Sequence, residues 1–145
     1  MKIFLLFISM IFSASFIQAQ PVPPQREDSW KISLNKKIIL ISNESNELLI
    51  TKKIKSTDWG KNGYLEINYK EADTGFWRRS FQLDDENGNQ LFNKDSTTHV
   101  KIPTTVLRKL FTGKKEVKIY MVKSPLNPEI LIRSQRVHLC TLKLP

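Results

Sequence analysis

The sequence predicts an all-β fold, an antiparallel two-sheet sandwich of the immunoglobulin-like or Greek-key type. Short segments in which apolar and polar residues alternate recur along the chain, separated by clusters of turn-forming residues, which indicates about seven to nine short strands. Only one segment, near residues 103–112, has the periodicity of a helix, so the repeated strand and helix alternation of a parallel sheet is missing. An antiparallel β-barrel is the alternative.

The amino-terminal residues 1–19 are expected to be a secretory signal peptide. Lys2 is followed by an apolar run to Phe16 that is short for a membrane span, and Ala19 offers the small residue that cleavage requires. An uncleaved membrane anchor is the alternative. The mature protein is therefore expected to be exported, either periplasmic or extracellular, with no transmembrane segment after cleavage.

Residues 20–29, QPVPPQREDS, include three prolines and lack a core-forming pattern, so we expect an extended linker there. The remaining residues 30–145 are long enough for one domain with its own core. The chain has a single cysteine, Cys140, so an intrachain disulfide is excluded. Because Cys140 lies within an apolar segment, we expect it to be a small buried residue.

The first half of this domain begins with Trp30, Ile32 and Leu34 alternating with polar residues, which predicts a half-buried strand. The apolar run at residues 38–41 is typical of a strand that is buried on both sides. After a polar turn, residues 47–52 are expected to form another short strand, and residues 56–63 a loop.

Two strands are predicted at residues 64–70 and 76–83 from strict alternation, and Asn87-Gly88 favours a tight hairpin turn after the second strand. The helix near 103–112 has Pro103 in its first turn and Gly113 just beyond its end. Further strands are expected at residues 117–122 and 136–144, where apolar residues again dominate.

The chain is basic, with a formal net charge of +9, and loss of the one lysine in residues 1–19 would leave +8. Such an excess favours an anionic glycan or an acidic protein surface as the partner. The lysines are scattered in pairs, among them Lys36-Lys37 and Lys52-Lys53, which is more typical of a soluble surface than of a nucleic-acid tail. Export adds to the expectation that nucleic acid is not the partner.

Known catalytic and metal-binding patterns do not fit the chain. The acidic turn at residues 84–89 lacks the ligands of an EF-hand, and His138 with Cys140 supplies only two of the ligands that zinc or copper needs. A Gly-x-Ser-x-Gly nucleophile motif is also missing. We therefore expect no enzyme activity, no catalytic residues, no bound metal and no cofactor.

Arg79 is the most informative residue of the central strands, because alternation places it on the apolar face between Trp77 and Phe81. An unpaired guanidinium there would be unfavourable. Either a carboxylate pairs with it, or its stem lies on Trp77 with the charge in water, or the face is an exposed binding surface. In the last case Trp77, Arg78 and Arg79, together with Trp59 in the 56–63 loop, are the candidate binding residues.

These observations lead to a hypothesis of an exported, non-enzymatic binding module that recognises an anionic or carbohydrate-bearing partner. The alternative is a small secreted or periplasmic inhibitor or accessory protein that binds another protein. The oligomeric state does not follow from the sequence.

Overall fold

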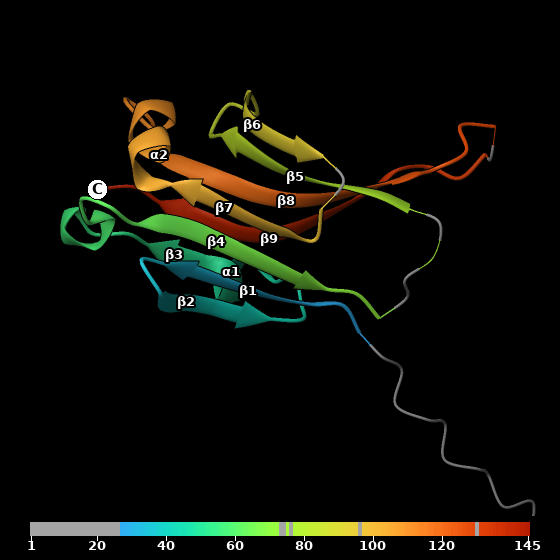
Figure 1. Ribbon diagram of the computed structural model, residues 1–145, viewed down its shortest axis with the longest axis horizontal. Coiled ribbons are helices and arrows are strands. Elements are labelled where there is room, and N and C mark those ends of the chain that lie inside the picture. Colours follow the sequence, from blue (N-terminus) through green and yellow to red (C-terminus); the bar gives the residue numbers. More distant parts are fainter. Residues whose placement is uncertain (1–26, 73–74, 76, 96, 130) are drawn as a thin grey trace, which may run out of the picture.

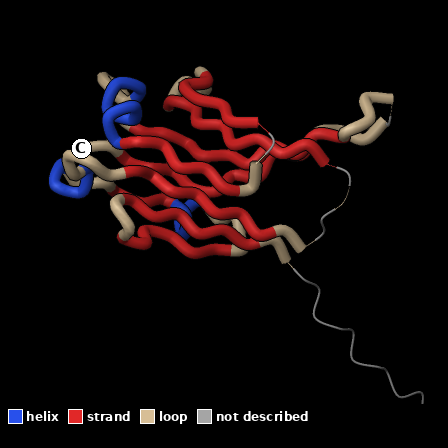
Figure 2. Tube along the Cα trace, viewed as in Figure 1, coloured by secondary structure: helices blue, strands red, loops and turns tan. Residues whose placement is uncertain are grey.

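The computed structural model describes residues 27–72, 75, 77–95, 97–129 and 131–145. These residues form two packed β-sheets that are mostly antiparallel, so the predicted two-sheet sandwich is confirmed (Figures 1 and 2). Neither sheet closes on itself in the described part of the chain, and the barrel alternative is therefore wrong. The expected signal peptide and most of the expected linker lie outside the described residues.

The sheets contain four and five strands. The four-stranded sheet has the order β2 (Lys37–Ser42), β1 (Ser29–Leu34), β4 (Tyr64–Lys70) and β7 (His99–Pro103). The five-stranded sheet has the order β3 (Thr51–Lys53), β9 (Gln135–Lys143), β8 (Glu116–Pro125), β5 (Trp77–Asp85) and β6 (Gln90–Asp95). The chain changes sheet after β2, after β3, after β4, after β6 and after β7, so strands that are consecutive in the sequence often lie in different sheets. The short β3 pairs with β9 in the parallel direction.

The core lies between the sheets and follows the alternation of the sequence. Trp30, Ile32 and Leu34 of β1 are buried, and in β4 they pair with the buried Tyr69, Ile67 and Leu65. The five-stranded sheet supplies Phe81 and Leu83 of β5, Val117, Ile119 and Met121 of β8, and Leu139, Cys140 and Leu142 of β9. Cys140 is fully buried as expected, and burial raises the pKa of its thiol to about 12.

The helix predicted near residues 103–112 is present as α2 (Thr104–Leu110). Leu107 is buried and Phe111 just beyond the helix is also buried, whereas Val106 is exposed. Among the described residues, no helix is long and apolar enough to cross a membrane.

Residues 47–52 differ from the expected strand. They begin with the short helix α1 (Glu47–Ile50), whose Leu48 N–H donates a hydrogen bond of 3.1 Å to the Asn46 side chain. Asparagine is a strong helix-capping residue, and this local hydrogen bond favours one helical turn before β3 begins. The expected loop at residues 56–63 likewise starts with a 3₁₀ turn, Ser56–Trp59.

Strand β2 was expected to be buried on both sides, and this expectation is wrong. Within the described part of the chain it is an edge strand with β1 as its single neighbour, and Ile38 and Ile41 are 52% and 67% exposed. The pairing with β1 shifts register between Ile32 and Ser33, so Ile38 lies opposite Ser33 and Ile41 opposite Lys31. This β-bulge places two isoleucines three residues apart on the same outer face of the sheet.

The expected linker also ends earlier than residue 29. Ser29 already belongs to β1, and Asp28 makes hydrogen bonds that are described below.

The turn between β1 and β2 packs against the loop at residues 56–63. Asn35 and Lys36 have φ angles of +53° and +68°, as in the two-residue hairpin turns that match strand twist. The Asn35 side chain donates a hydrogen bond of 2.5 Å to the carbonyl of Asp58 and lies against Gly60 and Gly63. A Cβ atom on Gly63 would lie 1.4 Å from Asn35 Oδ1, so this contact requires glycine.

We predict that Gly63→Ala lowers the free energy of unfolding by about 1–3 kcal/mol, the usual cost of overpacking. The measurement is chemical denaturation of the single variants Gly63→Ala and Asn35→Gly and of the double variant. Glycine at position 35 keeps the positive φ while removing the obstructing side chain, so Gly63→Ala should have little effect in that background. Equal effects of Gly63→Ala in both backgrounds would contradict the contact.

Candidate functional site

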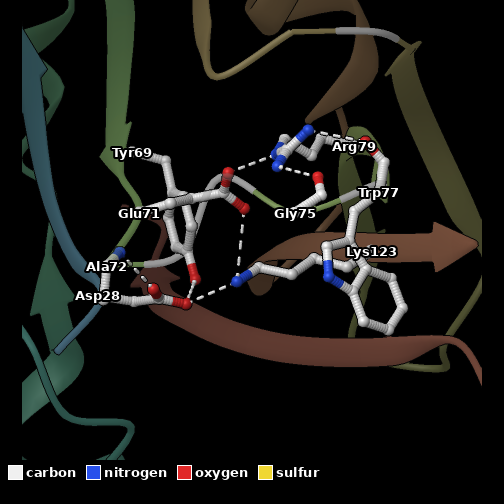
Figure 3. Close-up of polar contacts among 8 residues, drawn as sticks. All are labelled: Asp28, Tyr69, Glu71, Ala72, Gly75, Trp77, Arg79 and Lys123. Carbon is white, nitrogen blue, oxygen red and sulfur yellow. Dashed lines mark hydrogen bonds and ion pairs between the residues drawn. The ribbon is translucent and has the colours of Figure 1, made fainter. Parts of the chain in front are cut away.

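Arg79 is paired, as one of the three possibilities raised by the sequence requires. Its Nε donates to Glu71 Oε2, its Nη1 to the carbonyl of Trp77 at 2.6 Å, and its Nη2 to the carbonyl of Gly75 at 3.2 Å (Figure 3). The side chain is only 17% exposed. All three nitrogens of the guanidinium are therefore engaged within the chain.

A buried cation, Lys123, lies beside this half-buried pair. Lys123 Nζ is 2.5 Å from Asp28 Oδ2 and 3.3 Å from Glu71 Oε1, and its side chain is 9% exposed (Figure 3). The Tyr69 hydroxyl donates to Asp28 Oδ2 at 2.5 Å, and the Ala72 N–H donates to Asp28 Oδ1 at 2.9 Å. We call Asp28, Tyr69, Glu71, Arg79 and Lys123 the charge network.

The charge network contains two cations and two carboxylates, so it is electroneutral when all four are ionised. Burial acts to raise the pKa of Asp28, but hydrogen bonds from Lys123 and Tyr69 outweigh this and hold it below its usual value. Burial and the hydrogen bond to Asp28 raise the pKa of Tyr69 far above its usual value. The four charges pair with one another inside the fold, so removing any one of them would leave another charge without its partner.

Three of the four predicted binding residues lie together. Trp77, Arg78 and Arg79 line a hollow of about 390 Å³, which they share with Thr97, Thr98 and Leu126. Trp59 lies elsewhere: it is buried and packs edge to face on Phe111, with ring centroids 5.7 Å apart. The structure therefore does not bring Trp59 to the hollow that the other three residues line, and its ring is largely covered.

A second candidate surface, beside β2 and β3, is lined by several lysines. A groove of about 540 Å³ lies beside the edge strands β2 and β3, with Leu34, Ile38, Ile39 and Ile54 as its apolar lining. Four lysines line it as well: Lys37, Lys52, Lys53 and Lys55. We call this the lysine groove.

None of these four lysines forms an ion pair within the part of the chain that the structure describes. The one acidic residue of the lining is Asp58, whose Oδ2 accepts a hydrogen bond of 2.8 Å from the Lys55 N–H. The groove therefore carries an excess of positive charge beside an apolar surface.

The sequence did not reveal the lysine groove, because its lysines come from two segments that belong to different sheets. Lys37 begins β2, whereas Lys52 and Lys53 belong to β3 and Lys55 follows it. In the sequence, Lys36-Lys37 and Lys52-Lys53 each resemble an ordinary solvated pair of lysines. The signal that could have pointed to the site is that one such pair precedes and one follows the segment between β2 and β3.

In the acidic turn at residues 84–89, other groups of the chain donate hydrogen bonds to the carboxylate of Asp85. Asp85 accepts hydrogen bonds from Lys114 Nζ at 2.7 Å and from the N–H groups of Asn87 and Asn89. The hydrogen bond from Lys114, followed by those from Asn89, lowers the pKa of Asp85. Among the described residues, no group of three His, Cys, Asp or Glu side chains is arranged to hold a metal ion.

His138 joins α1 to the outer face of the five-stranded sheet. Its Nδ1 is 2.9 Å from Glu47 Oε2, and its Nε2 is 3.0 Å from Thr141 Oγ1. The order of carboxylate, imidazole and hydroxyl resembles that of a nucleophilic triad. However, Thr141 is only 1% exposed and its hydroxyl also donates to Glu47 Oε1 at 2.8 Å, so a substrate has no access to it.

No family model, curated protein or solved structure matches this chain.

We predict that Glu71→Gln destabilises the fold by about 3 kcal/mol or more, because it leaves the two cations of the charge network with one carboxylate. Thermal or chemical denaturation measures the change. The matched control is Glu116→Gln, which removes an ion pair to Lys143, whose side chain is 52% exposed. That change should cost less than about 1 kcal/mol, and equal effects of the two substitutions would contradict the structural role of the network.

We also predict that stability falls as the pH drops below about 6.5, the usual pKa of histidine. Desolvation lowers the pKa of His138, although the Glu47 carboxylate acts in the opposite direction. The unfolded chain therefore binds this proton more readily, and protonation favours unfolding. Denaturation between about pH 7.5 and pH 5 should show this loss, which His138→Gln should reduce; an unchanged slope in the variant would overturn the assignment.

Proposed function

We propose that this chain is an exported, non-enzymatic binding module for an anionic partner, and that the lysine groove is its binding site. The observation that carries the proposal is a set of four lysines that form no ion pair with any described residue and that line a partly apolar groove of about 540 Å³. Its volume is within the usual range for ligand sites. Export is supported by the apolar amino-terminal pattern.

Ordinary surface lysines are separated by water or paired with carboxylates. Gathering Lys37, Lys52, Lys53 and Lys55 around one groove brings like charges together, which is unfavourable until an anion enters. A bound anion relieves this repulsion and gains hydrogen bonds from the ammonium groups. The apolar lining lowers the local dielectric constant and strengthens both effects.

The groove supports acidic groups more strongly than sugar rings. Its lining includes no aromatic side chain among the described residues, whereas carbohydrate stacking uses aromatic faces. The sequence-based interest in a carbohydrate-bearing partner depended partly on Trp59, which is buried. A glycan would therefore be recognised through its sulfate or carboxylate groups.

The alternative of an inhibitor or accessory protein that binds another protein is favoured by one feature, the exposed Ile38 and Ile41 on β2. A partner held by apolar contacts would bind with little dependence on salt. A partner held by the lysines would bind less tightly as salt increases.

We predict that the double substitution Lys52→Glu and Lys53→Glu weakens binding of a sulfated oligosaccharide or an acidic peptide at least about tenfold, because each lost charged hydrogen bond contributes about 1.5–3 kcal/mol. Isothermal calorimetry at low and physiological salt measures this. Lys94→Glu with Lys109→Glu is the matched control, since it changes the net charge equally at exposed positions outside the groove. Equal losses in the two double variants would show that net charge alone, and not the groove, governs binding.

A further inference from the structure

We infer that the partner of the lysine groove is an acidic, extended polypeptide segment that adds to the four-stranded sheet along the free edge of β2. This inference rests on the proposed function, because the same lysines would neutralise the carboxylates of the segment. It adds the backbone conformation of the partner and the strand with which it pairs.

The first support is the position of β2 in its sheet. It has β1 on one side and no strand of the described chain on the other, so one row of its backbone N–H and C=O groups has no strand partner. An unpaired strand edge is a template for an additional strand, and many domains bind extended peptides in this way.

The second support comes from comparing β2 with the other edge strands. Charged residues occupy the other edges: β3 has Lys52 and Lys53, β6 has Lys94 and Asp95, and β7 has Lys101. Natural proteins use such charges to prevent unwanted strand pairing. Beyond Lys37, β2 has only the uncharged sequence IILIS, so it is the edge least protected against a further strand.

The third support is the exposed apolar surface of β2 and of α1, the helix that follows it in the chain. Ile38 and Ile41 on β2 and Leu48 and Leu49 on α1 are 52%, 67%, 89% and 51% exposed. The β-bulge places Ile38 and Ile41 on one face, where alternate side chains of an added strand would meet them. Exposed isoleucines on an open edge favour aggregation unless a partner covers them.

Charge determines the chemistry of the added strand. The groove beside β2 is lined by Lys37, Lys52, Lys53 and Lys55, so a segment along this edge passes a row of ammonium groups. A basic segment, including a second copy of β2 with its own Lys36 and Lys37, would be repelled. A segment that alternates acidic and β-branched residues satisfies both the lysines and the isoleucines.

The test uses a short peptide of alternating Glu and Val, and the same peptide with N-methyl groups on alternate amides. Both have the same charge, but the second has lost the backbone donors on one edge. We expect the first peptide to slow hydrogen exchange at the amides of Lys37–Ser42, measured by NMR, and to bind about tenfold more tightly than the methylated one, because two or so hydrogen bonds are lost.

Two variants locate the contact. Ile41→Ser should weaken the peptide severalfold, whereas Val106→Ser, at an exposed apolar position on α2, should not change binding. Lys52→Glu with Lys53→Glu should weaken both peptides. Circular dichroism checks that each variant is folded.

The possible outcomes separate this inference from the proposed function. If both peptides bind equally, or only a sulfated oligosaccharide binds, and the lysine variant still weakens binding, strand addition is wrong and the anionic site stands. If binding never depends on the groove lysines, both fail. If β2 is protected without peptide and the protein sediments as a dimer, the occupant is a second copy and the acidic strand is wrong.

Discussion

The charge network is the constraint on which the arrangement of the two sheets depends. Arg79 and Lys123 belong to β5 and β8 of the five-stranded sheet, whereas Asp28 and Glu71 adjoin β1 and β4 of the four-stranded sheet. Neither cation can be buried without a carboxylate, because the desolvation cost of an unpaired charge is several kcal/mol. The pairing that neutralises these charges therefore also fixes one sheet relative to the other.

The two ends of β1 differ in their electrostatic surroundings: charges balance at one end, and positive charge is in excess at the other. At its start, Asp28 lies in a network whose positive and negative charges balance. At its end, the turn at Asn35 lines the lysine groove, where four lysines surround a single aspartate. A balanced buried cluster stabilises the fold but has no charge left for a ligand, whereas an unbalanced exposed cluster is stabilised by binding one. The positive charges of the described residues thus include some that are paired inside the fold and others that line an open groove.

Local patterns in the sequence predicted most of the fold because they depend on near neighbours. The alternation in β1, β4 and β5 and the punctuation of α2 by Pro103 and Gly113 were sufficient to predict those elements. The prediction failed for residues 47–50, where the Asn46 cap competes with strand formation, and for β2, whose apolar run gives no sign of an edge. Strand order depends on long-range pairing, which a local pattern does not contain.

The sequence by itself determined the two-sheet class, and it left three possibilities for Arg79 on its apolar face, one of which was a carboxylate partner. Only the tertiary structure decided that the partner is Glu71, that Trp59 is buried on Phe111, and that Lys37 of β2 lines one groove with the lysines of β3. The physical reason is that periodicity specifies which face a side chain takes within its own strand. The neighbours of that face are set by how separate strands pack, and a local pattern does not contain that information.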